Sequence, residues 1–515
     1  MNLDGMRTHG TDDIVDVVVV GTGAGGAPLT AELARRGLSV VALEAGRNFS
    51  PDDLTPDETE AVEINWMSER LSGGTDATAF GPNNSGRGVG GSTLHWGAFT
   101  PRPDARDLRL RTETGEGRDW PLDPAELLSY VARVEGDIGV SGQTPYPWDP
   151  DRSYAYGPSP RNAPATLVAR GCEALGIRYA DAPAAVLTRA RLQDHRGERR
   201  ACINCGACHQ GCRVDAKATT ANTYLPVAVA HGAEIRTGAM VHDIELDARG
   251  HVAAVVYRQD GVDVRQRCRS LVLAAGGVET PRLLLHAGVA NGSGQVGRNF
   301  LAHGATQVWG RFDEPVRGHR GYPSSLITED MMRPADADFA GGYLVQSLGV
   351  MPLTFATTLT RGGGLWGREL MQRLDQAQHM AGIGINGDCL PSDGNRLELS
   401  DETDEFGIPR ARVTFTAGPN ENAMTEHATS FLLRVMEAAG ARETLVLARS
   451  AHTIGTARMS TDPADGVVDG DGRSHEIPNL WICDNSVFPS ALAANPALTI
   501  MALSLRTADR FLAAR

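Results

Sequence analysis

The sequence contains no run of 18 apolar residues, so no segment of it is expected to span a membrane. It also has no block of lysine or arginine, and its net charge is −14, from 49 basic and 63 acidic residues. Nucleic-acid-binding proteins normally carry a basic face, so neither nucleic acid nor an anionic membrane is expected as a main partner. The first residues are polar and lack the apolar core of a signal peptide, which favours a cytoplasmic location.

No internal repeat and no low-complexity tract occurs. The 515 residues are 41% hydrophobic and 22% charged, which is the usage of an ordinary globular protein. This length predicts about two to four domains. The eight cysteines are too few and too unevenly placed for a disulfide-stapled secreted protein, because half of them lie within residues 202–212.

A glycine-rich turn joins the first predicted strand to the first predicted helix. Gly21, Gly23 and Gly26 match the pattern G-x-G-x-x-G between a valine-rich apolar run and a helical pattern. Gly21 would allow the tight turn, Gly23 the close approach of a pyrophosphate, and Gly26 the packing of helix on strand. Glu44 ends the next predicted strand, where it would accept hydrogen bonds from a ribose. These features predict a dinucleotide site.

The glycine motif alone does not distinguish FAD from NAD. The chain length and a second glycine-rich stretch at residues 86–97 favour FAD. Residues 305–450 alternate short β-like stretches with loops, which indicates a separate, sheet-based domain. After residue 450 the strand–loop–helix pattern returns, so the nucleotide domain is expected to consist of discontinuous segments.

Five stretches together resemble the glucose–methanol–choline (GMC) oxidoreductase family of flavoenzymes. They are the glycine motif at Gly21 and residues 88–96, 275–285, 451–459 and 484–499. The resemblance implies an α/β fold with a Rossmann-like FAD-binding domain, and an α+β substrate domain with a mainly antiparallel sheet. The expected FAD-binding segments are residues 10–100, 200–305 and 450–515, and the expected substrate-binding or cap regions are residues 101–199 and 306–449.

The resemblance also implies the chemistry. Members of the family oxidise an alcohol to a carbonyl by removing the hydroxyl proton and passing a hydride to flavin N5. His452 matches the family's catalytic histidine in its His-x-x-Gly-Thr context, and a pKa near neutrality suits a base. Asn495 matches the second catalytic position, where an amide can orient the substrate but cannot take its proton. His452 is therefore the expected base.

The same stretches imply the residues that contact FAD. They are Gly21, Gly23, Gly26, Glu44, Gly90, Gly91, Ser92, His95, Val241, Ala275, Asp484, Asn495, Pro496 and Thr499. Asp484 matches a residue near the ribityl chain, and Val241 matches a position whose backbone contacts the adenine. The segment around His95 resembles that of pyranose oxidases, in which a histidine is bonded to the flavin 8α carbon. Covalent attachment and a histidine that only lines the flavin both stay open.

A cysteine cluster has the spacing of an iron–sulfur site. Cys202, Cys205, Cys208 and Cys212 follow the bacterial ferredoxin run C-x₂-C-x₂-C-x₃-C, and some members of the sugar-dehydrogenase branch carry such a cluster. Arg213 replaces the usual proline and no second run occurs, so a bound cluster is not favoured. Zinc, or a metal-free loop with one or two disulfides, are the alternatives.

We therefore predict an FAD-dependent alcohol oxidoreductase that acts on a sugar, glycoside or polyol. Oxygen or another acceptor would reoxidise it, and the chain could form an oligomer. The substrate class depends on the pyranose-oxidase-like segment at His95 and the sugar-dehydrogenase-like cysteine loop. The alternatives are a sterol or long-chain alcohol as substrate, a non-redox lyase with structural FAD, and an electron-transfer subunit of a larger complex.

Overall fold

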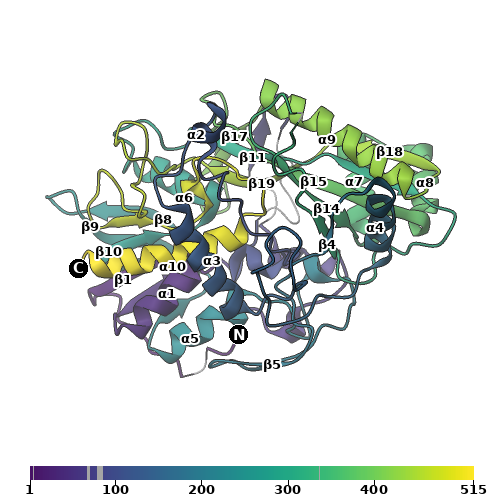
Figure 1. Cartoon of the computed structure of the whole chain (residues 1–515). Helices are drawn as coiled ribbons and strands as arrows, with labels where there is room; N and C mark the ends of the chain where they lie inside the picture. Colours follow the sequence, from purple (N-terminus) through teal and green to yellow (C-terminus); the bar gives the residue numbers. More distant parts are fainter. Residues whose placement is uncertain (4, 67–69, 78–84, 336) are drawn as a thin grey trace.

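The computed structural model describes residues 1–3, 5–66, 70–77, 85–335 and 337–515. Two large sheets organise these segments (Figure 1). The first has seven strands in the order β7-β2-β1-β10-β9-β8, with β20 also paired to β10. Its strands are β1 (Val15–Val20), β2 (Val40–Leu43), β7 (Glu234–Arg236), β8 (Met240–Leu246), β9 (Val252–Gln259), β10 (Val262–Leu273) and β20 (Leu480–Ile482).

The first sheet is parallel at its centre and antiparallel at one side. β1 lies between β2 and β10 and is parallel to both, and β20 is parallel to the last residues of β10. The earlier residues of β10 pair antiparallel with β9, which continues to β8. All four consecutive valines of residues 17–20 are buried, as the apolar run predicts for a central parallel strand.

Four helices pack together beside this sheet (Figure 1). They are α1 (Gly26–Arg35), α3 (Pro124–Ile138), α5 (Tyr224–Ala230) and α10 (Ala497–Ala513). A further helix, α6, covers Gly276–Ala287, whereas the sequence predicts that it begins only at Thr280. The glycines at its start suggest a turn, but the Asp484 carboxylate accepts hydrogen bonds from the Gly276 N–H (2.9 Å) and the Thr280 hydroxyl (2.6 Å). These bonds stabilise the first turn of α6.

The second sheet is antiparallel throughout, as the resemblance implies. Its order is β18-β12-β15-β14-β13-β4, and β11 pairs with both β15 and β19. Its strands are β4 (Ala180–Asp181), β11 (Phe300–Gly304), β12 (Gln307–Arg311), β13 (Leu326–Thr328), β14 (Tyr343–Leu348), β15 (Met380–Gly387), β18 (Glu443–Leu447) and β19 (Ser450–Gly455). The observed architecture is thus the expected α/β fold. The division into domains at the predicted boundaries stays a prediction.

Helices α4 (Ala163–Leu175) and α9 (Pro419–Ala438) pack on each other and on the second sheet. Two helices that the sequence does not predict, α7 (Pro352–Gly363) and α8 (Gly367–Asp375), lie near β18 at its edge (Figure 1). The remaining elements are α2 (Leu110–Thr114), a sheet of β3 (Leu71–Gly73), β16 (Arg396–Thr403) and β17 (Pro409–Thr414), and the hairpin of β5 (Arg191–Gln193) and β6 (Gly197–Arg199).

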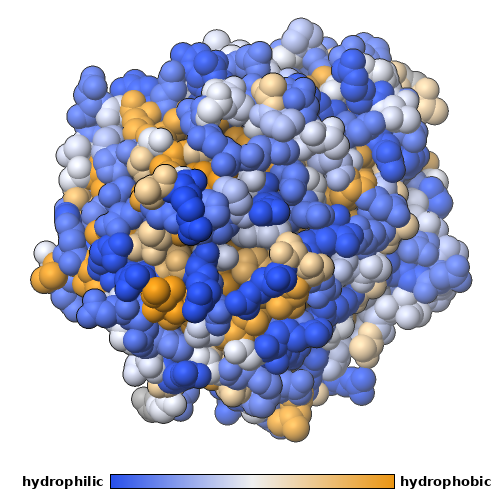
Figure 2. All heavy atoms as spheres, turned by 90° about the vertical axis from the view of Figure 1, so that its left-hand side faces the viewer, coloured by the Kyte–Doolittle hydropathy of each residue, from blue (hydrophilic) through white to orange (hydrophobic). Residues whose placement is uncertain are grey.

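The surface is mainly hydrophilic on the face drawn in Figure 2, with smaller apolar areas between the polar side chains. Within the described segments, no helix combines the length and the apolarity that crossing a bilayer requires.

The contact between α4 and α9 generates a prediction about stability. A Cβ added at Gly171 in α4 would lie 2.2 Å from the backbone oxygen of Val435 in α9, so Gly171→Ala must push the helices apart. We expect this change to lower the free energy of unfolding by about 1–3 kcal/mol. Gly136→Ala in α3 is the matched control, because nothing lies within 4 Å of its added Cβ. The control should stabilise the protein by about 0.5–1 kcal/mol. Urea unfolding checks both, and equal stabilities would contradict the close helix contact.

Candidate active site

The carboxyl ends of four neighbouring parallel strands lie in one row. β2, β1, β10 and β20 pair in register up to their last residues. The sequence-predicted residues that follow these ends within two positions are Gly21, Glu44, Ala275 and Asp484. Open α/β sheets bind their ligands at this edge, because the loops there leave a crevice. The fold therefore brings together residues that are up to 463 positions apart in the chain.

The two glycine-rich loops touch each other through their backbones. A Cβ on Gly91, whose φ is +53°, would lie 2.8 Å from the Cα of Gly23. The Gly90 N–H donates to the Thr22 hydroxyl (3.1 Å), which joins the second loop to the first. Gly26 has the packing role that the motif predicts, since its added Cβ would lie 2.0 Å from the Gly21 oxygen. Only glycine fits this contact between loops.

Glu44 accepts hydrogen bonds from both glycine-rich loops. One carboxylate oxygen accepts from the N–H (3.2 Å) and the hydroxyl (2.6 Å) of Thr22, and the other accepts from the N–H groups of Gly46 (3.0 Å) and Gly88 (3.1 Å). Burial raises the pKa of Glu44, and these hydrogen bonds oppose that shift. Glu44 also lines the cavity, and its contact with a ribose stays a prediction.

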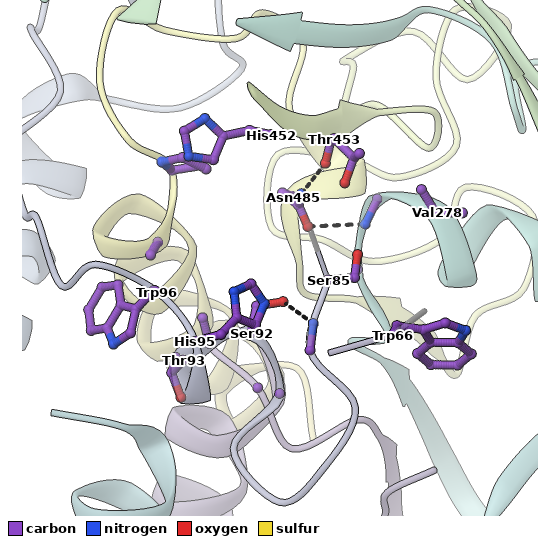
Figure 3. Close-up of a pocket in the computed structure, with 18 of the residues that line it drawn as sticks. Trp66, Ser85, Ser92, Thr93, His95, Trp96, Val278, His452, Thr453 and Asn485 are labelled. Carbon is purple, nitrogen blue, oxygen red and sulfur yellow. Dashed lines mark hydrogen bonds between the residues drawn. The ribbon is translucent and has the colours of Figure 1, made fainter. Parts of the chain in front are cut away.

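A cavity of about 360 Å³ extends from this edge to the face of the antiparallel sheet. Figure 3 shows His452 and His95 on its wall, with Trp66 at the far side. Of the sequence-predicted residues, the wall includes Gly21, Gly23, Glu44, Gly91, Ser92, His95, Val241, Ala275, His452, Asp484, Asn495 and Pro496. Gly26, Gly90 and Thr499 are not on the wall: the first two pack the loops, and Thr499 is fully buried in α10.

The wall has the features that FAD requires. The residues just before α1 line the cavity, and the first N–H groups of a helix have no partner within the helix. Such a helix start binds phosphate groups. A Cβ at Gly23 would make only ordinary van der Waals contact with Gly91 (3.6 Å), so packing within the chain does not require glycine there. The lack of a side chain leaves the Gly23 backbone on the cavity wall accessible to a dinucleotide pyrophosphate, and the residues present therefore fit the cofactor.

His95 presents an unpartnered nitrogen in this cavity. Its side chain is 4% exposed, and its Nε2 has no hydrogen-bond partner among the described residues. Burial, then the charge of Lys217 and of His209, lowers the pKa of His95 to about 3, so the imidazole is neutral at pH 7. A buried polar nitrogen is normally satisfied by a protein group, an ordered water or a ligand, so the His95 Nε2 is a free position on the cavity wall.

Two side chains tie the cysteine loop to the His95 segment. Lys217 is fully buried, and its Nζ donates to the backbone oxygens of Leu94 (2.8 Å), Trp96 (3.0 Å) and Cys208 (2.6 Å). The His209 Nδ1 donates to the His95 oxygen (3.1 Å). The loop that carries the four cysteines is thus part of the cavity wall's support.

The four cysteines are free thiols in the structure. Cys205 is exposed, Cys208 is buried, and Cys202 and Cys212 are intermediate. Within the described segments, no group of three or more His, Cys, Asp or Glu side chains is placed to hold a metal ion. The expectation that a cluster at these four cysteines is possible but not favoured stays a prediction.

A β-bulge positions His452. The pairing of β11 and β19 places Leu301 opposite Ile454 but His303 opposite Ala451, so His452 and Thr453 together oppose one residue of β11. The φ of His452 is +63°, a conformation that residues other than glycine rarely adopt. Bulges turn side chains out of the regular pleat. This bulge turns His452 toward the cavity (Figure 3).

His303 fixes the proton on His452. Its Nε2 lies 3.0 Å and 2.8 Å from the backbone oxygens of Ala491 and Leu492, which can only accept, so this nitrogen carries the proton. Burial lowers the pKa of His303 to about 4, so the ring is neutral and its Nδ1 is an acceptor. The Nδ1 of His452 lies 2.7 Å away and must donate to it.

His452 consequently keeps a lone pair on Nε2. Burial, then the charges of His303 and Arg449, lowers the pKa of His452 well below its usual range, so a single proton remains on the neutral ring. That proton is on Nδ1, as the bond to His303 requires. A neutral imidazole with a fixed tautomer and a free Nε2 can accept a proton from a hydroxyl group.

Asn495 lies just before α10, next to Asn386 of β15. The Asn386 Nδ2 donates to the Asn495 Oδ1 (2.9 Å). This bond occupies the amide oxygen of Asn495 and leaves its Nδ2 as a donor. Both residues line the cavity with His452. The arrangement offers one acceptor, on His452, and one donor, on Asn495.

His303, Asn386 and Arg449 are not among the residues that the sequence motifs predict. His303 and Asn386 lie outside the five stretches, and their partners come from distant parts of the chain. The one local signal is a polar residue within an otherwise apolar strand, as in Phe-Leu-Ala-His at residues 300–303. Arg449 lies two residues before one of the stretches and shows no pattern of its own.

Two family models described as GMC oxidoreductase match residues 71–305 and 391–504. The chain is 30% identical to the fructose dehydrogenase large subunit of Gluconobacter japonicus, over 96% of this chain and 97% of that relative. It is also 30% identical to paromamine 6'-oxidase of Streptomyces fradiae, over 98% of this chain and 92% of that relative. The solved structure of pyridoxine 4-oxidase from Mesorbium loti covers 97% of this chain and 99% of its own, with a TM-score of 0.67 and 18% identity, which is a likeness of fold.

The buried histidines generate a prediction about pH. Burial lowers the pKa of His95 to about 3 and those of His209 and His303 to about 4, below the ordinary value of 6.5. Between pH 6.5 and 4 the unfolded chain therefore binds more protons than the folded one, and stability falls as the pH falls. Each such histidine contributes up to about 1.4 kcal/mol per pH unit.

The variant His209→Gln isolates one of these contributions, because glutamine can still donate to the His95 oxygen. We expect the free energy of unfolding of the variant to fall less steeply than that of the wild type as the pH is lowered. The two slopes should differ by up to about 1.4 kcal/mol per pH unit, which corresponds to one bound proton. Urea unfolding of the variant and the wild type between pH 7 and pH 5 measures the difference. Identical slopes would contradict a buried, neutral His209.

Proposed function

The chain belongs to the GMC oxidoreductase family, and from that membership we propose that it oxidises an alcohol group of a sugar, glycoside or polyol to a carbonyl. It is an FAD-dependent alcohol or sugar oxidoreductase. The relatives named as fructose dehydrogenase and paromamine 6'-oxidase support the proposed substrate class. The observation that carries the mechanism is the hydrogen bond between His303 and His452.

His452 is the proposed base. Its free Nε2 takes the proton of the substrate hydroxyl, while its Nδ1 stays bonded to His303. The bond to His303 also keeps the ring from turning its protonated nitrogen toward the substrate. The charge that His452 gains can spread along this bond, because the His303 Nδ1 is an acceptor. Proton removal by a positioned base of this kind contributes about 10²- to 10⁴-fold to a rate.

Asn495 is the proposed orienting group. Its Nδ2 donates to the substrate oxygen, which becomes more negative as His452 takes the proton. Asn386 fixes the direction of this donor by holding the Asn495 amide oxygen. A donor that is already in place when charge develops stabilises the transition state without reorganisation.

The residues proposed to hold FAD are those of the strand ends and the two glycine loops, together with Asn495 and Pro496 at the start of α10. Gly23 and the start of α1 would hold the pyrophosphate, and Glu44, Val241 and Asp484 would hold the remaining nucleotide and ribityl groups. Bound FAD would supply the acceptor for the hydride of the alcohol carbon. The chain's own groups bind the alcohol, exclude water from it and take its proton.

The antiparallel sheet supplies amides suited to hydroxyl groups. Gln346, Gly384 and Gln307 lie opposite one another on β14, β15 and β12, and all three line the cavity. A Cβ at Gly384 would lie 2.9 Å from Leu348 and 3.1 Å from Gln307, so glycine is needed for these side chains to pack. The Gln307 Oε1 accepts from the Trp309 Nε1 (3.1 Å), which leaves the Gln307 Nε2 as a donor. Amide groups both donate and accept, as the hydroxyl groups of a polyol do. These features favour a polyol or sugar over a sterol or a long-chain alcohol.

Reoxidation is proposed to use oxygen or another diffusible acceptor. The cysteine loop supports the His95 segment through Lys217 and His209. This structural role explains why the loop lies beside the cavity, and it does not require an iron–sulfur cluster. Iron and sulfide analysis of anaerobically prepared protein tests this part of the proposal.

The mechanism predicts the effect of removing the base. His452→Asn keeps a residue that tolerates positive φ but removes the proton acceptor. Flavin reduction by substrate should slow by about 10²- to 10⁴-fold. Asn495→Ala should slow it less, because it removes orientation and not proton transfer. Anaerobic stopped-flow bleaching of the flavin at saturating substrate measures both. An unchanged rate in His452→Asn would remove His452 from the mechanism.

Variants of His303 separate its positioning role from packing. His303→Gln can accept from His452 through Oε1 and still donate to the backbone oxygens, whereas His303→Leu can do neither. The leucine variant should reduce flavin at least about tenfold more slowly, and the glutamine variant should restore most of the rate. Equal rates in the two variants would contradict the proposed tautomer control.

We further propose that His95 is the attachment point of a covalently bound FAD. Its neutral ring and unpartnered Nε2 on the cavity wall support this proposal. Acid precipitation should leave the yellow colour in the wild-type pellet, and His95→Ala should release it to the supernatant. Absorbance of both fractions is the measurement, and release of all flavin from the wild type would exclude the bond.

A further inference from the structure

Arg449 is a cation on the cavity wall. Its side chain is accessible and lines the cavity, and the protein around it desolvates it enough to lower its pKa. No carboxylate among the described residues forms an ion pair with it, and burial is the one cause of its pKa shift. A guanidinium that lines a cavity and forms no ion pair is available to an anionic ligand that enters it.

The other charged side chains on the wall are already satisfied. Arg70 and Arg282 form ion pairs with Glu279 at 2.9 Å and 3.0 Å. Glu44 and Asp484 accept hydrogen bonds from backbone and hydroxyl groups of the protein. Among the charged side chains of the described part of the wall, Arg449 is therefore the one without an ion pair, and its charge is positive.

Arg449 lies on the substrate side of the cavity. It comes three residues before His452, and its backbone oxygen accepts from the Ala305 N–H (3.0 Å), which holds it beside the antiparallel sheet. Its charge contributes to the low pKa of both His452 and His209. The nucleotide-binding loops lie on the other sheet. The position thus suits contact with a substrate held between His452 and the amides of Gln307 and Gln346.

We propose that Arg449 binds an anionic group on the substrate, so that the natural substrate is a sugar or polyol bearing a carboxylate or a phosphate. This inference rests on the proposed function and specifies its substrate class. The guanidinium is planar and offers paired N–H donors, which match the two oxygens of a carboxylate or a phosphate. The same charge repels an ammonium group, so amino sugars should be poor substrates at this site.

The test compares four compounds of one carbon skeleton with the holoenzyme. They are a neutral hexose or hexitol, the corresponding sugar acid, the corresponding sugar phosphate and the corresponding amino sugar. Anaerobic flavin reduction gives kcat and KM, and perturbation of the flavin absorption spectrum by each compound gives a Kd that does not depend on turnover. The sugar acid or the sugar phosphate should bind most tightly, and the difference between them identifies the anion.

Arg449→Gln should weaken binding of the anionic compound by about 10- to 100-fold and change binding of the neutral one by less than about threefold. Arg265→Gln is the matched control, because Arg265 is exposed and pairs with Glu245 outside the cavity. The control should change neither Kd. Equal affinity of the wild type for the neutral and anionic compounds, or an equal effect of Arg449→Gln on both, would overturn the inference.

Two further results would distinguish a failure of this inference from a failure of the proposed function. Loss of bound FAD from Arg449→Gln, seen as a lower flavin-to-protein ratio, would mean that Arg449 contacts the cofactor, and would overturn the inference while leaving the proposed function intact. Tight, Arg449-dependent binding of an anionic compound that never bleaches the flavin would support the anion site and contradict alcohol oxidation.

Discussion

The alignment of four parallel strand ends is the constraint on which the candidate site depends. β2, β1, β10 and β20 come from three distant parts of the chain, and their pairing ends in one row. If one strand slipped by a residue, the group that follows it would leave the row and its side chains would change face. The apolar β1 at the centre holds the register, because its valines are buried on both sides. The Asp484 bonds to the start of α6 depend on the same register.

The second sheet carries the proposed base, which does not come from the strand ends. The bulge in β19 takes His452 out of the pleat, and His303 on the neighbouring β11 fixes its tautomer. The backbone oxygens of Ala491 and Leu492 in turn fix His303, and they belong to the segment that leads to Asn495. The donor and the acceptor proposed for the substrate are thus parts of one hydrogen-bonded assembly, so a change in the loop before α10 would reach both.

The sequence allows the α/β fold and the GMC family to be predicted, because both depend on local patterns. The glycine spacing at Gly21 and the valine-rich strand before it are short-range features, and the structure has them where they are expected. The start of α6 is predicted wrongly, since its first turn is hydrogen-bonded to Asp484, some 200 residues away. His303 and Arg449 escape prediction for the same reason, because both depend on contacts in three dimensions. His303 acts at a bulge between two strands, and Arg449 is set apart because no described carboxylate forms an ion pair with it. The cysteine spacing is the opposite case. It is a strong local pattern, and whether the four cysteines bind a cluster stays a prediction.

The close contact of the two glycine loops has a consequence for how this protein can diverge. The nearest atom that an extra methyl group at Gly26 or Gly91 would meet is a backbone atom, which no change of a neighbouring side chain can remove. Gln307 and Gln346 sit instead on strands whose backbone bonds are independent of their side chains. Substitutions are therefore constrained at the glycine loops and tolerated on the face of the antiparallel sheet. Proteins that diverge from this one would keep the nucleotide-binding edge while the substrate that they bind changes.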